Sequence, residues 1–205
     1  MKPIAELRDY LDKQLARVIA HNNVTPTCGK GCFHCCREPV YAQRQEVRDI
    51  VSAMTNEERD RIKSKVRTWL TGFAVNGFGD QHRPKADKYR SCFLWCPLLA
   101  EDGSCSVYDR RPIECRLHLA RGPRLYCEDD KLRSKQEFIM PEGLIHAIMT
   151  AQVCALQDGE SLTWDHLGIL LAEELLGEEF PTASRFQVQR QGQKAVMITE
   201  AAKPA

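Results

Sequence analysis

Four cysteines lie close together in the segment Cys28-Gly-Lys-Gly-Cys32-Phe-His-Cys35-Cys36. A second group follows further along the chain and comprises Cys92, Cys96, Cys105 and Cys115. Thiolates are soft, anionic ligands, and zinc and iron–sulfur clusters both accept them in sets of four. Two close-spaced groups that folding brings together would form a closed thiolate site. Metal binding is therefore the first prediction from this sequence.

Chelation by two cysteines requires a loop that turns both sulfurs toward one ion. The spacing Cys32-x-x-Cys35 supplies such a loop, and Gly29 and Gly31 allow the tight backbone that it needs. Cys35 and Cys36 are neighbours whose side chains tend to diverge, so either one of them packs while the other ligates, or they serve two centres. The predicted ligands are Cys28, Cys32, Cys35, Cys36, Cys96, Cys105 and Cys115. Zinc and an iron–sulfur cluster both remain open as the cofactor.

Other cysteines and histidines are weaker candidates. Cys92 precedes the second group at a chelating spacing, and its role stays open. Cys127 stands apart and is expected to be a spare thiol, and Cys154 falls in an apolar helical pattern that predicts burial. His34 and His118 lie near the cysteines, where hydrogen bonding is expected more often than ligation.

Arginines flank the last two cysteines of the second group. Arg110, Arg111 and Arg116 have the reach to donate hydrogen bonds to thiolates or to offset their negative charge. A solvated, charged turn explains the same residues equally well. The sequence does not separate the two interpretations.

Composition favours a reduced, globular protein. The chain has 205 residues, 43% of them hydrophobic and 28% charged, with a net charge of +1, which fits one domain and gives no general bias toward nucleic acid. No window approaches the ~20 apolar residues of a membrane span. Charged residues run through the first twenty positions, so no signal peptide is expected and the predicted location is the cytoplasm. Thiols stay reduced there, which favours metal ligation over disulfides.

Apolar periodicity predicts a helical fold around the cysteines. Helices are expected at residues 3–22, 43–54, 55–73, 112–118, 141–156 and 162–176. Residues 76–91 read as an exposed connection, and the only strands are expected within residues 92–108. The predicted class is mainly α with an irregular cysteine-rich core and one or two short β-strands. Residues 1–180 form one predicted metal-binding domain, and residues 181–205 a flexible C-terminal tail.

Four segments in the same order resemble the YkgJ-type cysteine-cluster family, or CxxCxxCC family, whose domain chelates zinc or iron. They are Cys28/Cys32/Cys35/Cys36, Cys96-Pro97-Leu98-Leu99, Gly103-Ser104-Cys105-Ser106-Val107-Tyr108 and Arg111-Pro112-Ile113-Glu114-Cys115-Arg116. The first gap is three residues here rather than two. The resemblance covers residues 28–118 and implies metal chelation. The family is similar in its cysteine pattern to the flagellin lysine methylases.

Three functions follow as hypotheses. The leading one is a metal-binding protein that holds zinc or an iron–sulfur cluster through residues 28–36 and 96–115. The second is an iron–sulfur redox or methyl-transfer enzyme. Residues 28–35 have the cysteine spacing of radical S-adenosylmethionine enzymes, but no strand–helix repeat follows. The third is a zinc-stapled module for a protein partner. Neither a membrane nor nucleic acid is expected as a partner.

Overall fold

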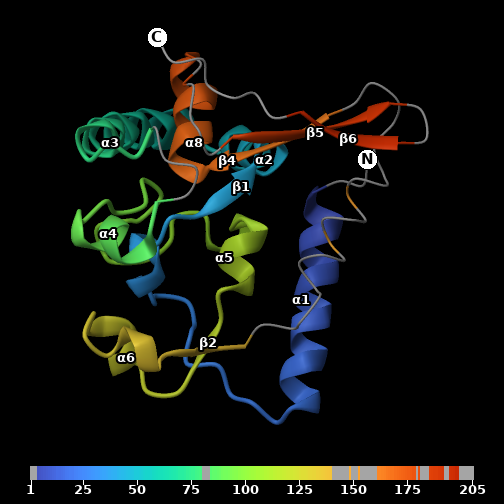
Figure 1. The fold of residues 1–205 in the computed structure, drawn as a ribbon, viewed down its shortest axis with the longest axis vertical. Helices are drawn as coiled ribbons and strands as arrows, with labels where there is room; N and C mark the ends of the chain where they lie inside the picture. The colour runs from blue at the N-terminus through green and yellow to red at the C-terminus, as the bar shows by residue number, and fades with distance from the viewer. Residues whose placement is uncertain are drawn as a thin grey trace.

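The computed structural model describes residues 4–79, 84–139, 148, 152, 161–178, 180, 185–191 and 194–198. These residues form helices and a few short antiparallel strands, which confirms the mainly α class (Figure 1). The α-helices described are α1 (Ile4–His21), α2 (Arg44–Ser52), α3 (Asn56–Val75), α4 (Ala86–Ser91), α5 (Ile113–Leu117), α6 (Leu125–Glu128) and α8 (Leu167–Leu176). Short 3₁₀ helices are η1 (His34–Arg37), η2 (Tyr108–Arg110) and η3 (Arg133–Lys135). None of the described helices has the length and apolar character needed to cross a membrane.

The main core forms where α2 and α3 pack on α8. Thr55 and Glu58 form a capping box that begins α3. One face of each helix is apolar, and its residues are almost fully shielded from solvent, as they are at Ile50, Val66 and Leu171. Helix α1 packs separately, against α5. The helices predicted from periodicity at 3–22, 43–54, 55–73 and 112–118 are confirmed, with ends shifted by a few residues.

A four-stranded antiparallel sheet has the order β1 (Tyr41–Gln43), β4 (Ser161–His166), β5 (Phe186–Gln191), β6 (Lys194–Ile198). A second sheet pairs β2 (Ala120–Arg121) with β3 (Glu137–Phe138). In the first, Tyr41 faces His166 and Trp164 faces Phe186. Figure 1 shows β5 and β6 projecting beside α8, with β1 running down toward the α4 and α5 region.

Two predictions about the C-terminal part differ from this sheet. Residues 162–166 were predicted as helix but form β4, because Leu162 and Trp164 turn to one face and stack against β5. Within residues 181–205, expected as a tail, residues 186–191 and 194–198 are paired strands. Phe186 and Val188 lie two residues apart on the same face of β5 and pack against β4, which accounts for the position of β5 beside β4. The helix predicted at 141–156 lies outside the described residues except at positions 148 and 152.

The segment before the second cysteine group is less open than predicted. Residues 76–91 were expected to be an exposed connection, yet α4 forms there, and Phe78 and Tyr89 are buried. The Trp69 indole donates to the Tyr89 hydroxyl at 3.0 Å, which fixes α4 on α3. Within residues 92–108, the pairing that the structure describes is a single bridge between Leu99 and Cys105 rather than full strands.

His166 is a buried imidazole at the junction of β4 and α8. Its Nδ1 accepts a hydrogen bond from Gly168 N at 3.2 Å and so caps α8. The rings of Trp69, Phe73 and Tyr89 surround it, with centroids 4.8, 5.4 and 5.3 Å away. Its Nε2 has no hydrogen-bond partner among the described residues. Burial lowers the pKa of His166 to about 3.

Because of the buried His166 side chain, we expect the folded protein to be less stable at acidic pH. The unfolded chain takes up the proton near the ordinary pKa of 6.5, whereas the folded chain resists it down to about 3. The free energy of unfolding therefore falls as the pH drops through this window, by about 2 kcal/mol between pH 7 and pH 5. Urea unfolding of wild type and His166→Asn at both pH values measures it. Asparagine can still cap the helix but does not titrate. The variant should therefore lose less unfolding free energy between pH 7 and pH 5 than wild type does. Equal losses in the two proteins would show that His166 is not the group responsible.

Candidate metal centre

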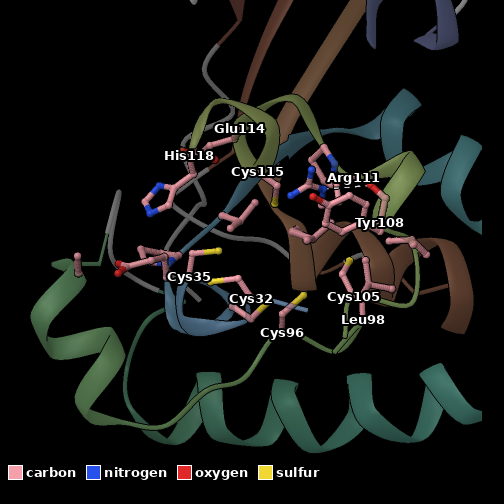
Figure 2. Close-up of a pocket in the computed structure, with 18 residues that line it drawn as sticks. Cys32, Cys35, Cys96, Leu98, Cys105, Tyr108, Arg111, Glu114, Cys115 and His118 are labelled. Atoms are coloured by element: carbon pink, nitrogen blue, oxygen red, sulfur yellow. Dashed lines mark hydrogen bonds between the residues drawn. The ribbon is translucent and has the colours of Figure 1, made fainter. Parts of the chain in front are cut away.

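Six cysteines line one cavity of about 220 Å³ (Figure 2). They come from three stretches of chain that are separate in sequence: the first cysteine segment, the bridge region of residues 96–105, and α5. The lining cysteines are Cys32, Cys35, Cys36, Cys96, Cys105 and Cys115. Folding therefore brings together six of the seven predicted ligands.

A tight loop presents the first group. Gly31 has a φ of +88°, a left-handed conformation that glycine adopts without strain. The chain then enters η1, which carries Cys35 and Cys36. The Cys36 carbonyl accepts a hydrogen bond from Cys96 N at 2.8 Å. This bond joins the first cysteine group to the second through the backbone.

A turn and a short helix present the second group. Ala100 N donates to Ser104 O at 2.8 Å, and Gly103 supplies the left-handed residue of this turn. A Cβ atom at Gly103 would lie 3.0 Å from the Phe33 ring, so the turn also packs closely on the first segment. Helix α5 begins after Pro112 and carries Cys115 into the cavity.

Four of the cavity thiols interact electrostatically in every pairwise combination. They are Cys35, Cys96, Cys105 and Cys115. Burial raises the pKa of Cys96 to about 12 and also raises the pKa of Cys105 and of Cys115. Without a bound cation, these three groups are neutral thiols at pH 7. A metal that binds them must displace their protons, so binding is linked to proton release.

Cys28 differs from the other predicted ligands because it does not line the cavity. Its sulfur accepts a hydrogen bond from Ala120 N at 3.1 Å. Its thiol donates to Cys32, which raises the pKa of Cys28 and lowers the pKa of Cys32 to about 5. Its sulfur also lies 3.9 Å from the carbonyl oxygen of His118, so Cys28 contacts two residues of the cavity wall, Cys32 and His118.

The six thiols border the cavity rather than converge on one point. No three His, Cys, Asp or Glu side chains, among the residues that the structure describes, form a group placed to hold a single ion. A mononuclear zinc site with Zn–S distances of about 2.3 Å would bring its sulfurs to within about 3.8 Å of one another. The donor set fits metal by its chemistry.

The weaker candidates lie in other surroundings. The Cys92 sulfur lies 3.0 Å from Asn76 Oδ1, and the buried Cys127 donates to Gln136. Neither lines the cavity. His34 stacks on a neighbouring ring and lies 3.3 Å from a carboxylate oxygen of α6. His118 does line the cavity, and burial lowers its pKa. Cys154 lies outside the described residues.

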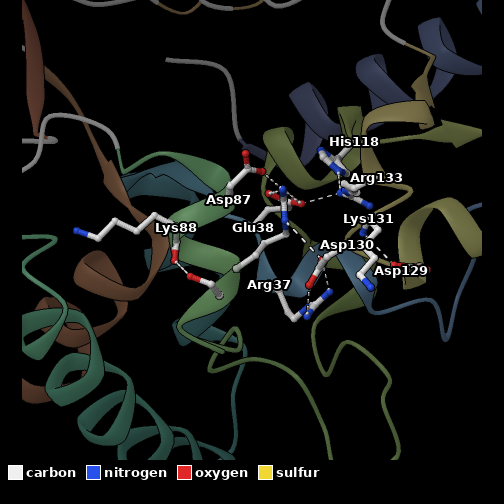
Figure 3. Close-up of polar contacts among 11 residues, drawn as sticks. Arg37, Glu38, Asp87, Lys88, His118, Asp129, Asp130, Lys131 and Arg133 are labelled. Carbon is white, nitrogen blue, oxygen red and sulfur yellow. Dashed lines mark hydrogen bonds and ion pairs between the residues drawn. The ribbon is translucent and has the colours of Figure 1, made fainter.

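An ion-pair network lies at one side of the cavity and was not predicted (Figure 3). Glu38, which lines the cavity, accepts hydrogen bonds from Arg90 at 2.9 Å and from Arg133 at 2.7 Å. Arg37 pairs with Asp130 at 2.8 Å. These contacts tie the first cysteine segment to α4 and to the segment before β3. The residues of this ion-pair network are far apart in the sequence, so no local sequence pattern predicts the network.

The three flanking arginines have separate positions. Arg110 is half exposed and lies 3.3 Å from Asp49. Arg116 is buried and donates to Asp12 at 2.5 Å. Arg111 lines the cavity with the cysteines. The three arginines therefore lie in different surroundings, although the sequence predicts the same role for each of them.

Comparison with known families places this arrangement among metal-chelating domains. A family model, CxxCxxCC, described as a "Putative zinc- or iron-chelating domain", matches residues 27–139. The match includes all seven predicted ligands and the ion-pair network. No curated protein and no solved structure matches the chain.

Proposed function

The chain belongs to the CxxCxxCC family of zinc- or iron-chelating domains, and from this premise we propose that its cavity of cysteines holds an iron–sulfur cluster. The observation that carries the proposal is the cavity itself. Six thiols are among the residues that line a cavity of about 220 Å³, which is large compared with the roughly 10–15 Å³ of such volume that one water molecule needs. A polynuclear centre suits such a space better than one ion does.

Cys35, Cys96, Cys105 and Cys115 are the proposed cluster ligands. These four interact with one another electrostatically and come from all three stretches of chain at the cavity, and four cysteines are the usual ligand set of a cluster. Cys32 and Cys36 border the same space, and Cys28 is hydrogen-bonded to Cys32. When bound, such a cluster supplies one-electron transfer at a potential set by its charge, hydrogen bonds and exposure.

Elemental analysis of protein purified without oxygen tests this function. We expect iron and acid-labile sulfide in stoichiometric amounts, together with the broad visible absorption of thiolate-ligated iron. Colourless protein with stoichiometric zinc would contradict the cluster while retaining metal chelation. Protein with neither metal, even after reconstitution with iron and sulfide or with zinc, would contradict both.

A further inference from the structure

We propose that Arg111 is the cation that offsets the negative charge of the cysteine centre, and that it thereby sets how firmly the metal is held and at what potential a redox centre is reduced. This inference rests on the proposed function. Four thiolates bring four negative charges to the site, and the ions of a metal centre neutralise them only in part. A fixed positive charge beside the sulfurs lowers the cost of assembling this anionic centre.

Arg111 is held at the cavity by Tyr108. Its Nε donates to the Tyr108 carbonyl at 3.0 Å, and its guanidinium carbon lies 3.7 Å from the centre of the Tyr108 ring. Both residues line the cavity, and Figure 2 shows them beside Cys105 and Cys115. The carbonyl hydrogen bond and the cation–π contact hold the guanidinium without a carboxylate partner. Its position is therefore set before any metal binds.

The charge of Arg111 reaches the sulfurs and is not taken up elsewhere. Cys35 and Cys105 both lie within its electrostatic range. No carboxylate pairs with Arg111 among the described residues, and of the lining residues described it is the one arginine or lysine. Its neighbours differ on this point, because Arg110 pairs with Asp49 and Arg116 with Asp12.

Its two remaining nitrogens can donate hydrogen bonds to thiolates. Guanidinium is a planar donor that stays charged at any ordinary pH. Donors of this kind, which orient and stabilise metal ligands, are typically worth 10–100-fold in metal affinity. In a cluster, a positive charge also favours the reduced state, which carries one more negative charge. Arg111 therefore acts as a positioning and tuning residue.

The test compares Arg111→Gln with Arg111→Lys and with Arg110→Gln. The first removes the charge, the second keeps a cation, and the third removes a neighbouring charge that does not face the cavity. Metal retention is measured as the rate of metal loss to excess EDTA, and thermal stability is measured on metal-loaded and metal-free protein. For a cluster, the midpoint potential is added by anaerobic titration.

We expect Arg111→Gln to lose metal about 10–100-fold faster than wild type, while Arg111→Lys retains most of the metal affinity and Arg110→Gln matches wild type. A cluster in Arg111→Gln should be harder to reduce, by about 59 mV for a tenfold change in the one-electron equilibrium. In the metal-free protein, Arg111→Gln loses only the contacts with Tyr108, so its loss of thermal stability should be smaller than that of the loaded protein.

Three results would overturn the inference while leaving the proposed function intact. They are unchanged metal retention in Arg111→Gln, equal losses in Arg111→Gln and Arg110→Gln, or a metal-free Arg111→Gln protein that is destabilised as much as the loaded one. The proposed function fails by a different observation. In that case the wild-type protein itself, before any variant is made, holds zinc in place of iron and sulfide, or takes up neither metal nor cluster.

Discussion

Cys115→Ser is expected to lower metal occupancy at least about tenfold at limiting metal and to lower the unfolding temperature of the loaded protein. Cys115 comes from α5 and interacts electrostatically with Cys35, Cys96 and Cys105, so its loss removes one side of the proposed ligand set. Serine is a poor ligand for soft metals. The free energy of metal binding contributes to folding, and both quantities should therefore fall together. Metal analysis and calorimetry on the same preparation measure them.

Cys92→Ser is the matched control for this substitution. Cys92 is also a partly exposed thiol in the second group, but its sulfur contacts Asn76 and the Lys88 carbonyl instead of the cavity. A serine hydroxyl can donate its one hydrogen to either of these acceptors. We expect the control to keep its metal and its stability. If Cys115→Ser behaved like this control, Cys115 would not be a ligand.

Arg185→Met is expected to cost about 3 kcal/mol in the free energy of unfolding, because it removes the cation that pairs with two buried carboxylates, of which Glu173 keeps its other pair, with Arg44 at 2.8 Å. Arg185 Nε donates to Asp165 at 3.1 Å, and its Nη2 donates to Glu173. Asp165 is fully buried and Glu173 is 9% exposed. The arginine thus joins β4 and α8 just before β5 begins. Urea unfolding followed by circular dichroism measures the change.

Arg121→Met provides the comparison, since it removes the same kind of side chain from an exposed ion pair. Arg121 and Glu137 lie 2.6 Å apart, with side chains 50% and 65% exposed. Exposed pairs contribute about 0–1 kcal/mol, so this variant should remain close to wild type. Similar losses in the two variants would mean that burial of the Arg185 pairs adds nothing.

The sequence predicts those parts of the molecule that local pattern determines. Helices α1 and α3 follow from apolar periodicity and capping, and the cysteine spacing indicates the cavity ligands. Strand β4 was mistaken for helix because residues 162–171 are almost all buried, and a continuous buried run has no distinguishing period. Residues 186–191 pair with β4 more than twenty positions earlier, at Leu162↔Val188 for example, and no local signal encodes that pairing.

Parts of the site also depend on contacts between residues that are far apart in the sequence. Glu38 meets Arg90 and Arg133 only after folding, so their roles have no signature in the sequence. The separation of Cys28 from the cavity depends on its bond to Ala120, which is equally remote along the chain. Arg111 differs from Arg110 through geometry alone. The residue types are thus predictable, and their division of roles is not.

The single backbone bond between Cys36 and Cys96 closes a long loop, and this has a consequence for how the centre is assembled in time. The chain between these residues contains α2, α3 and α4, which pack with α8 in the hydrophobic core. Core packing can therefore bring the two cysteine groups together before any metal arrives, so loop closure does not depend on the metal. A newly made chain would then present its two cysteine groups already side by side, and metal binding would be the last step of its maturation.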